Sequence, residues 1–263
     1  MSSNRITRMT AGRNGRKWLI PFFTAGYPSA RQTIELAKVA EDSGSDLVEL
    51  GMPFSDPLAD GPEIQHSSQI ALRNGMNLSG VFSIAESIRS KSDLPLILMG
   101  YFNPILAYGI DRFARQAGSS GVDGFIIPDL PVTEAGPFLG VAKENGLSVI
   151  FLVAPTTTEQ RLKAIDSACT DFVYVVTVTG VTGTGRKFGS ETDAYLRHLR
   201  KSLRKPFVAG FGVSSASTAR ALAKQADGVV IGSALMRACR ESKNFGAARR
   251  RIGKLLTEIR HAL

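Results

Sequence analysis

Eight short apolar runs, alternating with segments of helical periodicity, constrain the fold of this chain more than any other feature. The apolar runs are residues 18–24, 47–51, 94–99, 124–127, 148–153, 172–178, 206–210 and 228–231. Helical periodicity marks residues 31–43, 133–145, 159–168, 191–203 and 216–224. Strands that alternate with helices predict βαβ units and a parallel sheet, and eight such units predict closure. We therefore expect the α/β class, with residues 1–263 forming a single (β/α)8 (TIM) barrel domain.

Length and composition agree with this fold. A chain of 263 residues could form two small domains, but barrels of about 250 residues routinely form one, and 43% hydrophobic residues supply a large core. Two helical segments, 63–73 and 81–90, both fall between the second and third runs. One extra helix is therefore expected there. The last helix, 247–262, is basic on its outer face, which is typical of a solvated surface.

The second apolar run carries a carboxylate. Side chains alternate along a strand, so Leu47, Glu49 and Gly51 share one face, and Glu49 lies at the carboxyl end. No Lys or Arg occurs in residues 46–70. Burial should therefore raise the pKa of Glu49 and let it act as an acid and as a base. The alternative is a structural role, in which a distant arginine pairs with Glu49 and closes the rim of the barrel.

A loop rich in Pro and Gly, residues 53–62, follows this run and carries two further acids, Asp56 and Asp60. Its composition is unsuited to a strand or a helix. Asp60 precedes Gly61, which leaves two interpretations open. The residue is either a functional carboxylate or a turn residue or helix cap.

More candidates follow the other predicted strands, at the barrel end where such enzymes place their chemistry. They are Phe22, Phe23, Thr24, Tyr101, Asn103, Pro128, Asp129, Leu152, Tyr174 and residues 179–183. The aromatic and apolar members serve equally well as barrel packing or as ligand contacts.

The last two predicted strands lead into glycine-rich turns, GFGVSSAS (residues 210–217) and GVVIGSAL (228–235). Glycine lets backbone N–H groups approach an oxyanion, and a helix that starts beyond Gly232 and Ser233 presents free N–H donors. Paired loops after the last two strands of a barrel form a recurrent phosphate site. We expect phosphate there, with Gly183 as a further donor.

The residues that metal, Schiff-base or nucleophilic catalysis would need are not found in the expected patterns. His66, His198 and His261 are scattered without ligand spacing, so no metal is expected. No Lys lies on a predicted strand, which argues against a Schiff-base aldolase. Motifs for a Ser or Cys nucleophile are absent as well. Carboxylate acid–base chemistry on a phosphorylated small molecule remains.

The net charge and the cysteines indicate which partners the protein binds and in which cellular compartment it works. The net charge of +9 favours anionic ligands, but the 32 Lys and Arg form no stripe interleaved with aromatics, so nucleic acid is not expected. No apolar run reaches the roughly 18 residues that would span a membrane. Cys169 and Cys239 belong to no metal or redox spacing and fit packing roles in a reducing cytoplasm.

The first 18 residues are basic and free of acids, as in a transit peptide. They contain no apolar h-region, and the first core strand already begins at Trp18. Little room remains for a removable leader.

Several blocks of the sequence resemble the tryptophan synthase alpha chain family. They are PFFTAGYP (21–28), LVELGMPFSDPLADGPEIQ (47–65), GYFNPI (100–105), IIPDLP (126–131), GVTG (180–183) and the two phosphate loops. The blocks run in family order over essentially the whole chain. The block around Glu49 is very specific, whereas many barrels share the phosphate loops.

The resemblance implies cleavage of indole-3-glycerol phosphate to indole and D-glyceraldehyde 3-phosphate. Protonation of indole C3 turns the ring into an electron sink, so acids and bases suffice. As in the family, Glu49 would protonate C3 and accept the glycerol hydroxyl proton. Asp60 would take or stabilise the indole N–H proton, a role suited to an ionised carboxylate.

The resemblance also assigns the binding residues. The indole pocket would be formed by Phe22, Tyr101, Leu152, Tyr174 and Phe211, and phosphate would be held by Gly183, Gly212, Gly232 and Ser233. Thr182 would orient Asp60 when its loop closes. This loop departs from many relatives at residues 182–190 (TGTGRKFGS), which are flexible and basic.

Family members work with a beta chain that uses pyridoxal phosphate (PLP) to condense indole with serine, as an alpha2-beta2 heterotetramer. No cofactor is expected in this chain. Family interface positions correspond to Pro53, Phe54, Asp56, Pro57, Leu58, Asn103 and Pro104, and an apolar loop tip suits a partner better than solvent. Three alternatives stay open: a regulatory subunit that mainly activates its partner, a stand-alone lyase, and another phosphate-binding barrel isomerase.

Overall fold

The computed structural model describes residues 4–12, 14–176, 190–210 and 212–263. Within them, nine parallel strands form one sheet in the order β5-β4-β3-β2-β1-β9-β8-β7-β6. Their bounds are β1 Trp18–Thr24, β2 Val48–Gly51, β3 Leu96–Met99, β4 Gly124–Ile126, β5 Ser148–Ile150, β6 Leu152–Val153, β7 Val173–Val176, β8 Phe207–Gly210 and β9 Gly228–Ile231.

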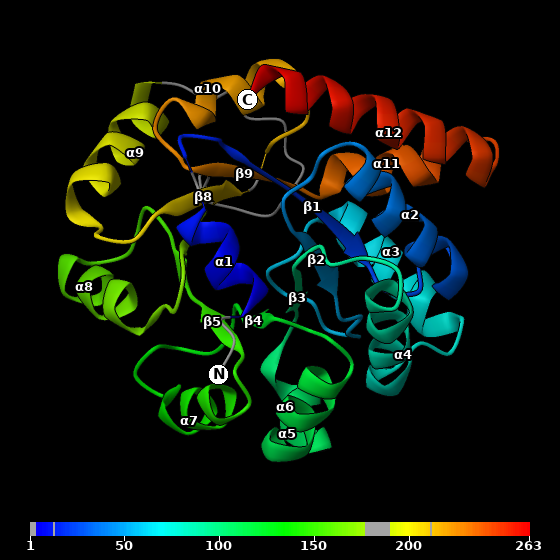
Figure 1. Cartoon of the computed structure of the whole chain (residues 1–263), viewed down its shortest axis with the longest axis horizontal. Helices are drawn as coiled ribbons and strands as arrows, with labels where there is room; N and C mark the ends of the chain where they lie inside the picture. The colour runs from blue at the N-terminus through cyan, green and yellow to red at the C-terminus, as the bar shows by residue number, and fades with distance from the viewer. Residues whose placement is uncertain (1–3, 13, 177–189, 211) are drawn as a thin grey trace.

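The two ends of this order are one stretch of chain, so the sheet closes. Only Phe151 separates β5 from β6, and its carbonyl accepts a 3.0 Å hydrogen bond from the backbone N–H of Tyr174 on β7. The predicted run 148–153 is thus the fifth of eight barrel strands. The (β/α)8 barrel prediction is confirmed, and helices surround the strands (Figure 1).

The helices of the described residues include all those that were predicted. They are α1 Arg5–Ala11, α2 Ala30–Asp42, α3 Pro62–Arg73, α4 Leu78–Arg89, α5 Phe102–Tyr108, α6 Ile110–Ser119, α7 Gly136–Glu144, α8 Glu159–Ala168, α9 Ser190–Ser202, α10 Ala216–Ala223, α11 Ser233–Glu241 and α12 Phe245–Ala262. Two helices, α3 and α4, lie between β2 and β3, where most strands of a barrel are joined by one. The predicted extra helix is thus confirmed. Capping moves the start of α4 to Leu78, because the Asn77 side chain accepts from the N–H of Gly80.

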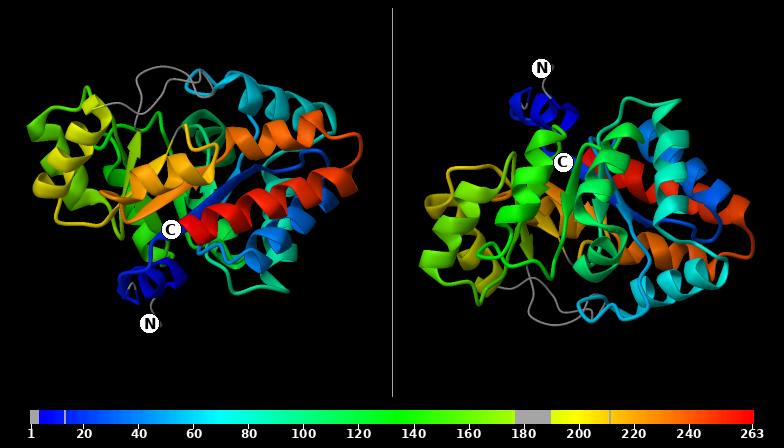
Figure 2. Two further views of the ribbon diagram at one scale, coloured as in Figure 1. Left: turned by 90° about the horizontal axis from the view of Figure 1, so that it is seen from above. Right: turned by 90° about the horizontal axis from the view of Figure 1, so that it is seen from below.

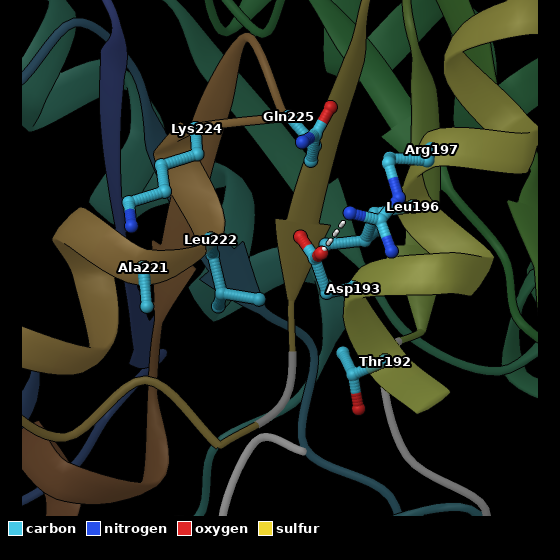
Figure 3. Close-up of a pocket in the computed structure, with 8 residues that line it drawn as sticks. All are labelled: Thr192, Asp193, Leu196, Arg197, Ala221, Leu222, Lys224 and Gln225. Carbon is cyan, nitrogen blue, oxygen red and sulfur yellow. Dashed lines mark ion pairs between the residues drawn. The ribbon is translucent and has the colours of Figure 1, made fainter. Parts of the chain in front are cut away.

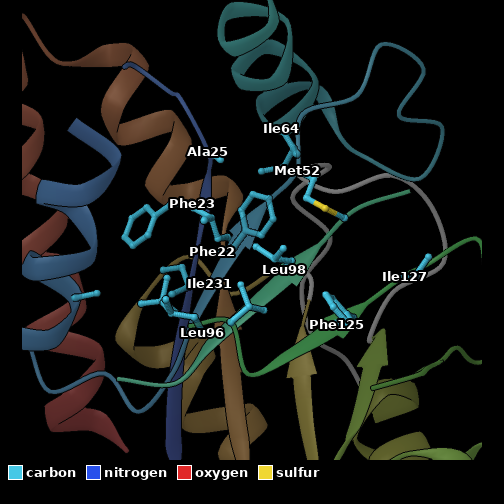
Figure 4. Close-up of a cluster of buried hydrophobic side chains, with 14 of the residues drawn as sticks. Phe22, Phe23, Ala25, Met52, Ile64, Leu96, Leu98, Phe125, Ile127 and Ile231 are labelled. Atoms are coloured by element: carbon cyan, nitrogen blue, oxygen red, sulfur yellow. The ribbon is translucent and has the colours of Figure 1, made fainter. Parts of the chain in front are cut away.

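The buried residues divide between the two sides of the barrel wall. Outward-facing strand residues such as Phe23, Leu98 and Phe125 pack under the helices (Figure 4). Inward-facing residues fill the barrel, and they include Trp18, Ile20, Leu47, Ile97, Ile126, Ile150, Phe172, Tyr174, Val208 and Val230. This alternation explains why each strand is a short apolar run, buried on both faces.

Helix α1 closes the amino-terminal end of the barrel. Ile6 is fully buried among the inward-facing residues. The Asn4 amide donates to the Asp123 carbonyl (2.7 Å) and to Ser148 Oγ (2.9 Å). Figure 2 shows α1 at the end opposite to the loop that leads into α3. Residues 4–12 are therefore part of the barrel.

Truncating Ile6 should destabilise the fold. Ile6→Ala leaves a cavity under the barrel, and we expect it to lower the free energy of unfolding by about 2–5 kcal/mol. Urea unfolding monitored by circular dichroism measures the loss. The control is Thr7→Ala on the exposed side of α1, which should change stability by no more than about 0.5 kcal/mol. Equal small changes in both variants would show that α1 contributes little to the barrel.

Candidate active site

Glu49 lies inside the barrel on β2, and it is the last inward side chain of that strand because Gly51 has none. It is in register with Phe22 on β1 and with Ile97 on β3, and Ile97 belongs to the inward-facing cluster. Because neighbouring residues of parallel strands in register share a face, Glu49 also points inward. Its side chain stands beyond Leu47, two residues earlier on the same face, as the sequence predicted.

The Glu49 carboxyl group is completely buried and has no polar partner among the described residues. Neither Oε1 nor Oε2 accepts a hydrogen bond there, and no ion pair reaches it. Desolvation raises the pKa of Glu49 well above its ordinary value. The structural alternative of an arginine partner is thus wrong for the described part of the chain. Burial therefore favours the protonated carboxyl, which is the form that can donate a proton.

Asp60 faces the same interior from the loop after β2. Burial raises its pKa to about 6, and a hydrogen bond with the Tyr101 hydroxyl opposes that rise. The Tyr101 hydroxyl also accepts from the N–H of Ala59 at 3.0 Å. Gly61, not Asp60, is the N-cap of α3, so the helix-cap interpretation of Asp60 is wrong. Near pH 7 the Asp60 carboxylate is mostly ionised and oriented by Tyr101.

Tyr174 brings the two acids into one site. It lies on β7, buried and in register with Leu152 on β6. Desolvation raises the pKa of its phenol, and the nearby charges of Glu49 and Asp60 raise it further. The carboxyl group of Glu49 on β2 and that of Asp60 in the loop after β2 therefore both act on the pKa of this one buried phenol. The two acids have different environments: Glu49 has no partner in the part of the chain that the structure describes, whereas Asp60 is hydrogen bonded.

Phe22 and Leu152 provide apolar surface to this interior. The Phe22 ring lies over Gly51, where any Cβ atom would overlap it. A Cβ on Gly232 would come within 3.2 Å of the Phe22 Cβ, so Phe22 stands between the Glu49 strand and the last glycine loop. Leu152 is partly exposed and packs against the inward-facing cluster. A flat apolar ring is the kind of ligand that such side chains suit.

Backbone donors are available at the start of α11. Gly232 is its N-cap, and no side chain caps the helix. The first N–H groups of a helix lack internal partners and attract anions. By contrast, Ser215 and Thr218 form a capping box on α10, which satisfies donors there. Gly212, with φ of 89°, adopts a backbone conformation that favours glycine in the neighbouring loop. These features suit an anion, and the assignment of phosphate to Gly212, Gly232 and Ser233 stays a prediction.

Three predicted site residues lie outside the described residues: Thr182, Gly183 and Phe211. The same holds for residues 179–181 and for most of the loop 182–190. Their roles stay predictions. Asp129 has a local function, because its carboxylate accepts from the N–H of Phe102 at the start of α5 (2.9 and 3.1 Å).

The predicted interface residues lie in two segments, the Asp60 loop and the start of α5. Leu58 is 89% exposed, and the Phe54 ring packs on Tyr101 with 5.3 Å between centroids. Asp56 and Asn103 are exposed, whereas Pro53, Pro57 and Pro104 are half-buried. Leu106 on α5, which is 50% exposed, was missed. Its signal was an apolar residue three positions after Asn103, on a helix that was not predicted.

Metal binding and membrane insertion find no support in the described residues. Among them, no three His, Cys, Asp or Glu side chains gather as a metal site would require. The helices of that part of the chain are too short or too polar to cross a bilayer.

A hollow of about 420 Å³ lies between α9 and α10, on the outside of the barrel (Figure 3). None of the candidate site residues lines it. Its Asp193 carboxylate pairs with Arg197 at 2.6 Å, one turn further along α9. We assign no catalytic role to it.

Comparison with known proteins points to one family. The family model "Tryptophan synthase alpha chain" matches residues 9–260. The tryptophan synthase alpha chain of Xanthomonas axonopodis pv. citri is 45% identical over 252 residues, which cover 95% of this chain and 94% of the relative. The alpha chain structure from Legionella pneumophila has a TM-score of 0.89 at 34% identity, covering 99% and 97% of the two chains.

A further solved structure concerns mutual activation of the tryptophan synthase a2b2 complex from Pyrococcus furiosus. A chain of that complex has a TM-score of 0.85 at 37% identity, covering 93% of this chain and 98% of that one.

Proposed function

The chain belongs to the tryptophan synthase alpha chain family, and from that premise we propose which of its residues carry the reaction. The alpha chain is the lyase half of tryptophan synthase. This protein is accordingly a lyase of tryptophan biosynthesis that cleaves indole-3-glycerol phosphate to indole and D-glyceraldehyde 3-phosphate.

The observation that carries the proposal is the carboxyl of Glu49 on β2, which is buried and has no partner among the described residues. Glu49 donates its proton to indole C3, which leaves an iminium-like ring. The resulting carboxylate accepts the proton of the hydroxyl on the adjacent glycerol carbon. The bond between that carbon and C3 then breaks, its electron pair returns to the ring, and the carbon becomes the aldehyde. Glu49 ends protonated, so the cycle balances.

Asp60 and the apolar side chains support this step. The ionised Asp60 carboxylate accepts the indole N–H, whose acidity rises when C3 is protonated, and Tyr101 orients it. Phe22, Leu152 and Tyr174 hold the ring, with Phe211 completing the pocket. Gly212, Gly232 and Ser233 hold the phosphate together with Gly183. Thr182 orients Asp60 when the loop after β7 closes over the substrate.

The raised pKa of Asp60 predicts a pH dependence. The carboxylate is lost as the pH falls through about 6, so kcat/KM should fall below that pH. Phosphate monoesters also titrate near pH 6, so the substrate itself could produce this limb. The control is Tyr101→Phe. Removing the hydroxyl removes a hydrogen bond that lowers the pKa of Asp60, so the limb should move to higher pH. If the fall of kcat/KM at low pH occurs at the same pH in Tyr101→Phe as in the wild type, it reports the titration of the substrate phosphate and not of Asp60.

We further propose that the protein acts with a tryptophan synthase beta chain as an alpha2-beta2 heterotetramer and passes indole to it. The beta chain would hold PLP and make L-tryptophan from L-serine. The relationship to the Pyrococcus furiosus complex supports this partner. The exposed side chains of Leu58 and Leu106 suit an interface that includes Pro53, Phe54, Asp56, Pro57, Asn103 and Pro104.

One experiment separates the alternatives. Indole release is measured with the purified protein alone and after adding purified beta chain. Stimulation of a measurable lyase rate supports the complex. Equal rates with and without partner would favour a stand-alone lyase. A negligible rate alone, with strong stimulation of tryptophan formation by the beta chain, would favour a mainly regulatory subunit.

Two broader proposals accompany the activity. Residues 1–263 form a single barrel domain, supported by the one closed sheet, and a single unfolding transition is the expected result. The protein is cytoplasmic, supported by two buried cysteines that are not paired with each other. Cofractionation with a cytoplasmic marker tests this compartment.

A further inference from the structure

An ion-pair cluster around the buried Glu63 connects two helices, α3 after the Asp60 loop and α11 after Gly232. Glu63 lies in the first turn of α3, three residues after Asp60, and only 5% of it is exposed. Its Oε1 accepts from Arg237 Nε at 3.2 Å and from Arg240 Nη2 at 3.0 Å. Both arginines belong to α11, the helix that begins at the phosphate loop. The cluster joins residues 174 and 177 positions apart in the sequence.

In the proposed function, each helix of the cluster is tied to one end of the substrate. The N–H groups at the start of α11, after Gly232, are the donors assigned to the phosphate. At the start of α3, the Gln65 side chain donates to the Asp60 carbonyl at 2.8 Å, which fixes the backbone of Asp60 to this helix. The helices α3 and α11 pack directly against each other (Figure 1). A displacement of α11 therefore reaches the Asp60 loop through Glu63.

Stability alone is a poor explanation for this arrangement. The arginine side chains are 39% and 42% exposed, and ion pairs with exposed members contribute little to stability. The second oxygen, Oε2, is buried without a hydrogen-bond partner among the described residues, which costs free energy. What the cluster does provide is a defined register between two helices, a role for which buried charges are known.

We propose that Glu63 is a positioning residue that couples phosphate binding on α11 to the placement of the Asp60 carboxylate. The inference rests on the proposed function. The substrate has a fixed length between its phosphate and its indole ring, and misplacement by about 1 Å can cost of order 100-fold in rate. Glu63 holds the separation of the two anchors at that length. Part of the phosphate binding energy thereby serves catalysis at the indole end.

The test compares two substrates in the Glu63→Gln variant, which keeps the side-chain volume and removes the charge. The substrates are indole-3-glycerol phosphate and indole-3-glycerol, which lacks the phosphate. We expect the ratio of their kcat/KM values to fall about tenfold, mainly through kcat for the phosphorylated substrate. The rate with indole-3-glycerol should change less than threefold. A purely structural role would lower both rates together and leave the ratio intact.

The matched control is Glu241→Gln at the end of α11, the helix that carries Arg237 and Arg240. Glu241 pairs with Arg251 at 2.9 Å on the surface, and its side chain is 43% exposed. This variant should keep the wild-type ratio. Arg240→Lys retains the charge at the cluster and should keep the ratio within about twofold, whereas Arg240→Gln should lower it. These arginines are half exposed, so their variants remain informative if Glu63→Gln folds poorly.

The outcomes separate this inference from the proposed function. An unchanged ratio in Glu63→Gln and Arg240→Gln, or a loss shared equally by both substrates, overturns the role of Glu63. Wild-type cleavage of the phosphorylated substrate, and its loss in Glu49→Gln, tests the proposed function without involving Glu63.

Discussion

Replacing Glu49 by glutamine is expected to lower the cleavage rate by about 10⁴-fold, the upper end for a general acid–base residue. The magnitude follows from the two proton transfers that Glu49 performs, one to indole C3 and one from the glycerol hydroxyl. An amide can do neither. Because glutamine has almost the same shape, substrate affinity should change little, and the loss should appear in kcat.

The measurement is indole release in single-turnover experiments with excess enzyme, together with substrate affinity by equilibrium binding. Melting temperature serves as the folding control. Burial raises the pKa of Glu49 and keeps the carboxyl neutral, so a neutral amide should not destabilise the protein. Glu86→Gln, at an exposed position of α4, is the matched substitution and should retain wild-type kcat. Turnover of Glu49→Gln within tenfold of wild type would remove Glu49 from its proposed role.

The barrel could be predicted from the sequence because its strands are buried on both faces. Each strand therefore appears as a short apolar run, and Glu49 is conspicuous as the charge within such a run. The residues of α1 carry a weaker signal. Ile6 alone is buried on this seven-residue helix, and its basic neighbours resemble a leader. The pair α5 and α6 was also missed; Gly109, with φ of 90°, ends one short helix and begins the next.

Parts of the site depend on contacts that no local pattern contains. The raised pKa of Glu49 could be predicted, since residues 46–70 lack a cation and the strand is apolar. The hydrogen bond between Tyr101 and Asp60 could not, because it joins two loops. The same holds for Glu63, whose arginines lie on a helix near the other end of the chain. Its only local signal was a charge at the start of α3, where an acidic residue also suits the helix dipole.

Replacing Asp60 by asparagine should lower kcat by about 100-fold or more, which is less than the loss for Glu49. Asparagine keeps the size of the side chain but removes the negative charge that stabilises the indole N–H after C3 is protonated. Glu49 can still transfer its protons, so some turnover remains. Asp42→Asn, at an exposed position at the end of α2, is the control and should leave kcat unchanged.

An analogue methylated at the indole nitrogen shows whether Asp60 acts at that atom. Without the N–H, the wild-type enzyme loses the interaction that Asp60 provides, so the penalty of Asp60→Asn should shrink to a few-fold on the analogue. This double-mutant logic isolates the energy between one side chain and one substrate atom, provided that the methyl group is tolerated. Equilibrium binding of the analogue checks that condition. If the penalty stays near 100-fold on an analogue that binds normally, Asp60 acts elsewhere in the reaction. Its hydrogen bond with Tyr101 would then matter for the shape of the pocket rather than for the charge at nitrogen.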